Sequence, residues 1–66
     1  MKITANGEAL EVASEVTLPA FLESQGFALG RVVVERNGAA LTPAQQRETV
    51  LADGDQLEIV RIVAGG

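Results

Sequence analysis

The pattern of hydrophobic and polar positions predicts a β-hairpin at the start of the chain. Asn6-Gly7 is a dipeptide typical of a two-residue hairpin loop, and it separates two short alternating runs at 1–5 and 9–12. With that loop, alternation gathers the apolar side chains on one face and sets Lys2 opposite Glu11, as an ion pair, on the other. The shared apolar face consists of Met1, Ile3, Leu10 and Val12, with Ile3 opposite Leu10.

A short amphipathic helix is predicted between Thr17 and Gly26. Thr17 can accept a hydrogen bond at the first turn, and Gly26 suits the left-handed conformation that often follows a helix. Leu18, Phe21 and Leu22 recur at the spacing of one helical face, so they are expected in the core. Because an isolated helix of this length is marginal in water, a sheet must hold it.

The second half of the chain predicts three further strands. Residues 31–36 contain three consecutive valines, and Asn37-Gly38 turns this run into a second hairpin strand at 39–41. The polar segment 42–49 is interpreted as a loop that contains a helical turn. The run 56–63 is the most apolar, which is typical of a central strand.

Together these elements predict one α+β domain over residues 1–66, with a mixed five-stranded sheet and one main helix packed on one face. A central last strand would lie beside the first strand. One short helix cannot cover both faces of such a sheet. The uncovered face, or the end of the last strand, is therefore a candidate partner surface.

Composition narrows the chemistry that side chains can supply. The chain has no cysteine and no histidine, which excludes disulfides, thiolate-bound zinc and an imidazole proton shuttle. Its carboxylates are scattered singly and are interpreted as solvated surface charge. The turn at 53–55 lacks the further ligands of a calcium loop. The sequence therefore favours a protein that is not an enzyme and has no metal site.

Charge and hydropathy limit the partners. Five basic and nine acidic residues give a net charge of −4, and two phenylalanines are the only aromatic residues, so nucleic acid is not an expected partner. No apolar run approaches the length of about 18 residues that a membrane span needs. A turn signal at Asn6-Gly7 leaves no room for a signal peptide, so we expect a cytoplasmic protein without a membrane partner.

The sequence ends on Gly65-Gly66 directly after its most apolar strand. Such residues can be a frayed end, and a fragment can stop there by accident. A tail of Ala64, Gly65 and Gly66 can also thread a narrow channel, where the reactive group would be the α-carboxylate of Gly66. ATP can convert a carboxylate to an acyl-adenylate, from which a sulfur or nitrogen nucleophile displaces AMP. This pattern predicts a carrier whose partner is the catalyst.

The last fourteen residues, 53–66, combine an Asp-Gly-Asp turn, an apolar strand and a terminal Gly-Gly. With the opening residues 2–8 and the middle residues 32–38, they resemble the sulfur carriers of thiamine biosynthesis, the ThiS family. The resemblance covers essentially the whole chain and implies a ubiquitin-like β-grasp fold with a flexible C-terminal tail, residues 64–66. After Pro43 the family often has Arg and then an aromatic residue, where this chain has Ala44 and Arg47. Contacts of that loop are therefore not carried over.

The resemblance also implies a mechanism. A ubiquitin-activating-type enzyme would adenylate Gly66 with Mg-ATP, and the carrier itself would bind no cofactor. A persulfide on a sulfur donor protein would then convert the adenylate to a C-terminal thiocarboxylate. Thiazole synthase would take the sulfur from it. The absence of cysteine agrees with this scheme, since the sulfur would be carried on the backbone terminus.

Three other interpretations of the chain remain open. It could be the small subunit of molybdopterin synthase, a protein modifier that forms isopeptide bonds through Gly66, or a passive β-grasp interaction module. Under each carrier interpretation we expect Val60, Ile62 and Val63 near the partner contact, although some of them could instead belong to the core. The acidic surface favours a partner with a basic docking patch.

Overall fold

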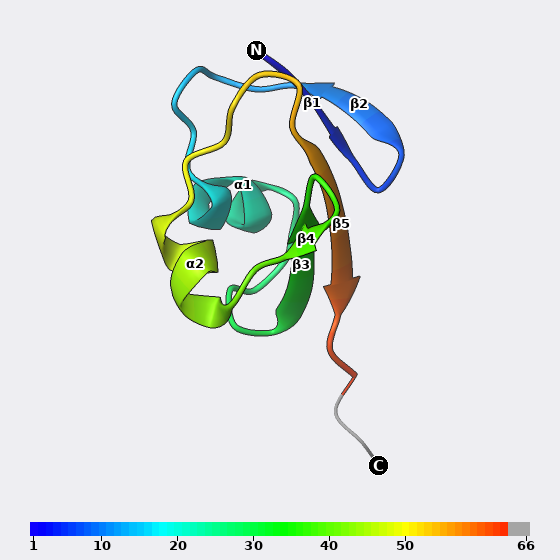
Figure 1. Ribbon diagram of the computed structural model, residues 1–66, viewed down its shortest axis with the longest axis vertical. Helices are drawn as coiled ribbons and strands as arrows, with labels where there is room; N and C mark the ends of the chain where they lie inside the picture. The colour runs from blue at the N-terminus through cyan, green and yellow to red at the C-terminus, as the bar shows by residue number, and fades with distance from the viewer. Residues whose placement is uncertain (64–66) are drawn as a thin grey trace.

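The structure is a computed structural model, and it describes residues 1–63 of the chain. Two strands precede each of the two helices, and a last strand follows the second helix, as Figure 1 shows. Their bounds are β1 Lys2–Ala5, β2 Glu8–Glu11, α1 Leu18–Ser24, β3 Val32–Arg36, β4 Ala39–Ala40, α2 Pro43–Glu48 and β5 Gln56–Arg61.

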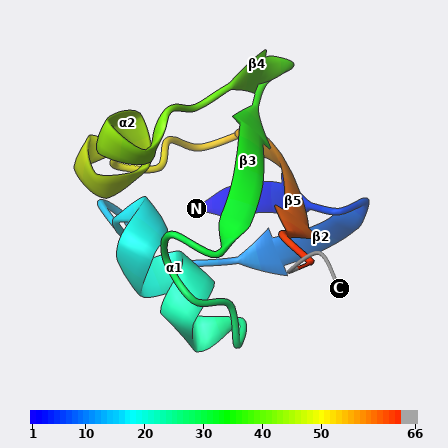
Figure 2. The ribbon, with the colours of Figure 1, turned by 90° about the horizontal axis from the view of Figure 1, so that it is seen from below.

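The strands form one mixed sheet in the order β2-β1-β5-β3-β4. Strand β5 runs parallel to β1 and antiparallel to β3, so the most apolar strand is central and lies beside the first, as predicted. Both helices lie on the same side of the sheet in Figure 2. The predicted α+β arrangement, with a main helix on one face of a mixed five-stranded sheet, is confirmed.

The first hairpin has the predicted register. Ile3 pairs with Leu10 and Lys2 with Glu11, and Ile3 is buried in the core. The predicted ion pair between Lys2 and Glu11 is wrong, because the Glu11 carboxylate lies 3.9 Å from the N-terminal ammonium group of Met1 instead. That ammonium group is held in place by its hydrogen bond to the carbonyl of Val12, at 2.7 Å, whereas the Lys2 side chain extends into solvent.

Helix α1 forms for the reasons that the sequence indicates. The Thr17 hydroxyl accepts a hydrogen bond from the amide of Ala20, and Gly26 has a φ of +81° just beyond the helix. The apolar stripe of the helix meets the inner face of the sheet, where the buried core lies. The core residues are Ile3, Leu18, Phe21, Leu22, Val32, Val34, Leu51, Leu57 and Ile59.

Helix α2 is longer than the single turn expected in the segment 42–49. Thr42 and Gln45 form a capping box, in which each side chain hydrogen-bonds to the backbone amide of the other, and this extends the turn into a six-residue helix. Strand β5 is shorter than the predicted 56–63, because its partner strand β3 begins only at Val32.

Candidate functional site

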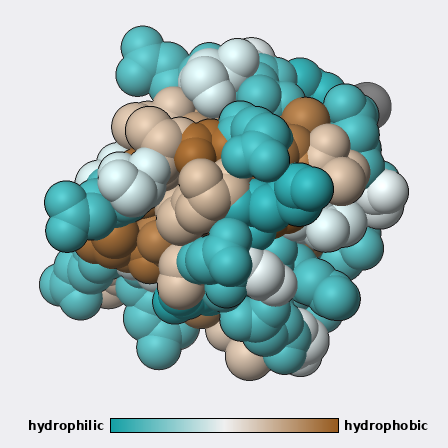
Figure 3. Space-filling view, turned by 90° about the horizontal axis from the view of Figure 1, so that it is seen from above, coloured by the Kyte–Doolittle hydropathy of each residue, from teal (hydrophilic) through white to brown (hydrophobic). Residues whose placement is uncertain are grey.

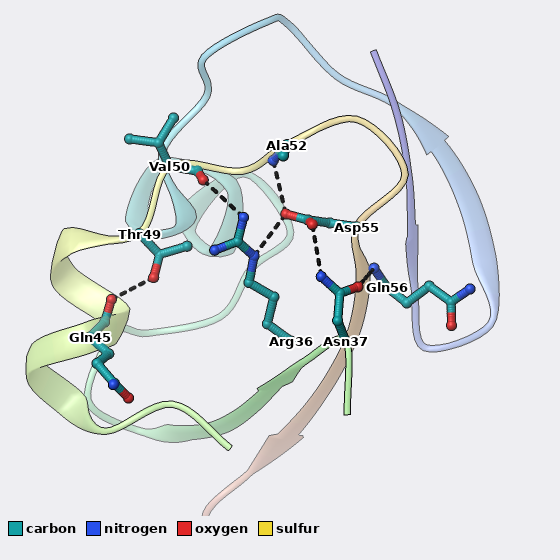
Figure 4. Close-up of polar contacts among 8 residues, drawn as sticks. All are labelled: Arg36, Asn37, Gln45, Thr49, Val50, Ala52, Asp55 and Gln56. Carbon is teal, nitrogen blue, oxygen red and sulfur yellow. Dashed lines mark hydrogen bonds and ion pairs between the residues drawn. The ribbon is translucent and has the colours of Figure 1, made fainter. Parts of the chain in front are cut away.

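The buried carboxylate of Asp55 anchors the start of β5 (Figure 4). Its oxygens accept hydrogen bonds from Arg36 Nε at 2.9 Å, Asn37 Nδ2 at 3.0 Å and the amide of Ala52 at 2.8 Å. Burial alone would raise the pKa of Asp55, but these donors and the charge of Arg36 outweigh it and hold the pKa below its usual value. The network ties the turn before β5 to the end of β3.

Two turn asparagines hold β5 from both sides. The Asn6 side chain donates to the carbonyl of Ile59 at 3.0 Å and accepts from the amide of Ile59 at 2.7 Å. On the other side, Asn37 Oδ1 accepts from the amide of Gln56 at 2.9 Å. Both asparagines have positive φ, 50° and 52°, which this residue type tolerates better than most. The path of the central strand is therefore fixed by both hairpin turns.

The sheet face opposite the helices carries exposed apolar side chains near the end of β5. Val33 and Val60 pair across β3 and β5 and are 47% and 61% exposed, and Ile62 continues the same alternation at 56% exposed. We call Val33, Val60 and Ile62 the outer patch. Next to it on the same two strands, Glu35 and Glu58 are paired directly, so carboxylates border the patch.

The structure places the predicted contact residues at the end of β5, whereas the predicted tail residues lie outside its described part. Strand β5 runs toward the lower end of the molecule in Figure 1, and the predicted contact residues Val60, Ile62 and Val63 are all exposed rather than in the core. Val63 is 86% exposed and is the last residue described. The predicted tail residues Ala64, Gly65 and Gly66 lie outside the described residues, so the structure does not place the proposed sulfur attachment point.

The structure shows three contacts at the end of β5 that the sequence did not predict. The amide of Ile62 donates to the carbonyl of Arg31 at 2.9 Å. The guanidinium of Arg61 lies 4.5 Å from the centroid of the Phe27 ring and donates to the carbonyl of Gly26 at 3.3 Å. Sequence analysis missed Arg61, because nothing in the local pattern shows that the residues after α1 lie beside the end of β5.

An open hollow of about 320 Å³ lies between α2 and the second hairpin. Two of its polar side chains already have partners, since Arg36 is paired with Asp55 and the Thr49 hydroxyl donates to the carbonyl of Gln45 (Figure 4). The hollow therefore offers no convergent set of groups for catalysis. It is lined by Arg36, Leu41, Gln45, Glu48, Thr49 and Val50.

The described residues contain neither a cluster of metal ligands nor a helix that could cross a membrane. Among residues 1–63, no three carboxylates gather closely enough to hold a metal ion. Neither α1 nor α2 is long and apolar enough to cross a membrane. At the end of the molecule opposite the tail root, hydrophilic side chains surround an apolar band (Figure 3).

The central strand, its two flanking hairpins and the helices on one face define the ubiquitin-like β-grasp class. The sequence profile of the ThiS family matches residues 1–66, and the chain belongs to that family. A crystal structure of a thiamine biosynthesis protein (ThiS) from Geobacter metallireducens has the same fold, with a TM-score of 0.82 and 30% sequence identity over the whole of both chains.

Two thiazole synthases also match this chain over its full length. The one from Magnetococcus marinus is 39% identical over 66 residues, and the one from Paramagnetospirillum magneticum is 35% identical over 66 residues. Each match covers 20% of the synthase. The chain therefore spans about a fifth of the length of these relatives, which contain a segment similar to it within a longer polypeptide.

Proposed function

We propose that this protein is a sulfur carrier of thiamine biosynthesis, and that it carries sulfur as a thiocarboxylate on the backbone carboxyl group of Gly66. Membership of the ThiS family over all 66 residues is the observation that carries the proposal. The geometry of residues 1–63 supports it, since β5 is held at its start by Asp55 and leads to the exposed Val63. In this scheme the partners supply the catalysis.

The proposed chemistry has three steps. An activating enzyme with bound Mg-ATP joins the Gly66 carboxylate to AMP and releases pyrophosphate. The terminal sulfur of a persulfide attacks the acyl carbon and displaces AMP, and a thiol then cleaves the sulfur–sulfur bond to leave the thiocarboxylate. Thiazole synthase takes the sulfur from that group. The carrier contributes its terminal carboxyl group and a tail without bulky side chains, Ala64 and Gly65.

Thiazole synthase is the proposed acceptor because of the two matched relatives. In both, a segment 35–39% identical to this chain is part of the same polypeptide as a thiazole synthase. Covalent linkage raises the effective concentration of one domain at another, so it favours an encounter between the two. We propose that thiazole synthase is likewise a partner of this chain.

Docking is proposed to use the outer patch together with Val63. Val33, Val60 and Ile62 offer an exposed apolar surface beside the root of the tail, and their burial would place the tail next to the partner. Glu35 and Glu58 border the patch, and the chain carries a net charge of −4. A partner surface with an apolar centre and basic residues at its edge fits this arrangement.

Substitution of Gly65 tests the requirement for a narrow tail. Gly65→Val adds a β-branched side chain next to the reacting carboxyl group. We expect ATP–pyrophosphate exchange by the activating enzyme to fall by about a hundredfold or more, because small misplacements of reacting atoms cost that much. The unfolding temperature should not change. Ala13→Val, which adds the same type of side chain in the exposed loop between β2 and α1, is the matched control.

The result distinguishes the carrier from the passive module. A carrier loses exchange with Gly65→Val and retains it with Ala13→Val, whereas normal exchange by Gly65→Val would contradict the proposal. The acceptor is tested in a second reaction, in which the sulfur-loaded chain is offered to thiazole synthase or to the large subunit of molybdopterin synthase. Transfer to the molybdopterin enzyme alone would replace the thiamine assignment.

A further inference from the structure

Arg61 is the last residue of β5, and its side chain contacts the segment that follows α1. The register pairs it with Val32, a core residue on the inner face, so its side chain lies on the helix side of the sheet. There the guanidinium stacks over Phe27, 4.5 Å from the ring centroid, and donates to the carbonyl of Gly26 at 3.3 Å. Arg61 therefore connects the end of the central strand to the chain just beyond α1.

The end of β5 has few other connections. Strand β1 pairs with β5 only at Gln56 and Leu57, and Asn6 extends that contact as far as Ile59. From Val60 onward, β3 is the one neighbouring strand in the described structure, and the bond from Ile62 to the carbonyl of Arg31 continues that ladder. A strand end with one neighbour opens more readily than one with two, because fewer hydrogen bonds must break.

The platform that receives Arg61 is itself fixed. Phe27 is half-buried and packs against the core, and its amide donates to the carbonyl of Leu22 at 2.9 Å. A guanidinium suits this place better than an ammonium group, since its flat surface stacks on the ring while its edge donates to a carbonyl. The contact joins a strand end that has one neighbouring strand to a residue that packs against the core.

We infer that Arg61 is a positioning residue, which holds the end of β5 against Phe27 and Gly26 so that the tail enters the activating enzyme from a fixed direction. The part that concerns adenylation rests on the proposed function. Arg61 then acts through the backbone of the strand end and does not touch ATP or the reacting carboxyl group. Its loss slows the reaction of the docked complex more than it weakens docking.

The inference is tested with Arg61→Ala, Phe27→Leu and the double variant, and with Arg31→Ala as a matched control. Arg31 is an exposed arginine at the same end of the sheet, and its alanine variant keeps the backbone carbonyl that Ile62 binds. Hydrogen exchange of the Ile62 amide is measured in the free protein. Adenylation is measured as kcat and KM for the carrier in ATP–pyrophosphate exchange.

The expected result is a change in the same direction for both single variants. It is larger for Arg61→Ala, because Phe27→Leu leaves the hydrogen bond to the Gly26 carbonyl in place. Hydrogen exchange of the Ile62 amide rises about fivefold or more in Arg61→Ala, which loses one exposed cation–π contact and one hydrogen bond. It rises about twofold to fivefold in Phe27→Leu, which loses the cation–π contact alone.

In each variant the kcat falls by a similar factor while KM stays within about twofold. The double variant adds little to Arg61→Ala, because that change already removes the contact with Phe27. Arg61→Lys restores part of the loss, and Arg31→Ala changes neither quantity.

Three outcomes would overturn the inference. Unchanged exchange at Ile62 in Arg61→Ala would show that the contact anchors nothing. A rise in KM without a fall in kcat would make Arg61 a docking residue, and an equal loss in Arg31→Ala would assign the effect to charge alone. If the unmodified chain is not adenylated, the proposed function fails. Hydrogen exchange of the Ile62 amide still decides whether Arg61 holds the end of β5.

Discussion

Asp55 is the residue at which protonation and folding are most directly linked. Asp55 as a whole is 4% exposed, and its carboxylate accepts hydrogen bonds from Arg36, Asn37 and the amide of Ala52. These donors hold its pKa below the usual value, so the folded state releases the proton more readily than the unfolded chain does. The stability from this group is therefore present above the unfolded pKa of about 3.9 and is lost as pH falls through the lower folded value.

Asp55→Asn should remove part of this acid sensitivity. The free energy of unfolding of the unmodified chain is expected to fall as pH is lowered below about 4, and the variant should start lower and fall less steeply. Denaturant titrations at a series of pH values measure both curves. Asp53→Asn removes the same charge from the same turn but leaves the Arg36 ion pair, so it should keep the steep fall. Parallel curves for Asp55→Asn and the unmodified chain would contradict the account.

At the scale of elements, β5 depends on the turns of both hairpins. Asn6 and Asn37 satisfy backbone groups of β5 that no neighbouring strand reaches, and each takes the positive φ that its turn requires. A glycine would fit either turn but would leave those backbone groups without a partner. The two Asn-Gly turns therefore specify the position of the central strand as well as the hairpins.

Asn6→Gly tests this second role. Glycine accepts a φ of 50° without strain, so the turn is kept while both hydrogen bonds to Ile59 are lost. We expect the free energy of unfolding to fall by about 1–3 kcal/mol, the range for buried backbone groups left without partners. Chemical denaturation at neutral pH measures the change. A loss smaller than about 0.3 kcal/mol would show that water replaces the Asn6 side chain without cost.

The role of the outer patch on β3 and β5 in docking can be tested separately. Val60→Ser removes apolar surface from the patch at a position that is 61% exposed, so stability should change little. If the patch docks on the activating enzyme, KM for the carrier should rise about tenfold, the loss expected for a central apolar contact. Val50→Ser is the matched control, because Val50 is 50% exposed and lies outside the patch. An equal rise in KM for both variants would show that the outer patch is not part of the docking surface.

At the scale of the whole molecule, most of the fold could be predicted from the sequence. Asn6-Gly7 fixes a turn length and alternation fixes a face, so together they predicted the register of Ile3 against Leu10 correctly. The capping box between Thr42 and Gln45 was readable, but Pro43 and the polar residues around it favoured a loop.

The part of the site that escaped prediction is long-range. Arg61 and Phe27 are far apart in the sequence, and they meet only because α1 packs so that the chain after it lies beside the end of β5. The ion pair of Glu11 with the N-terminal ammonium group likewise depends on where the hairpin places Met1. Local patterns hold no information about either contact, because tertiary packing creates both.

Intact mass spectrometry shows directly whether Gly66 carries sulfur. The chain is incubated with the activating enzyme, Mg-ATP and a persulfide donor, with a reaction lacking ATP as the control. Exchange of one oxygen for sulfur adds about 16 Da, nearly the mass that oxidation of Met1 adds, so the terminal fragments are sequenced. We expect an ATP-dependent increase in mass that is confined to the fragment that contains Gly66. An unchanged C-terminal fragment, with active enzyme and a sulfur donor present, would contradict the proposed function.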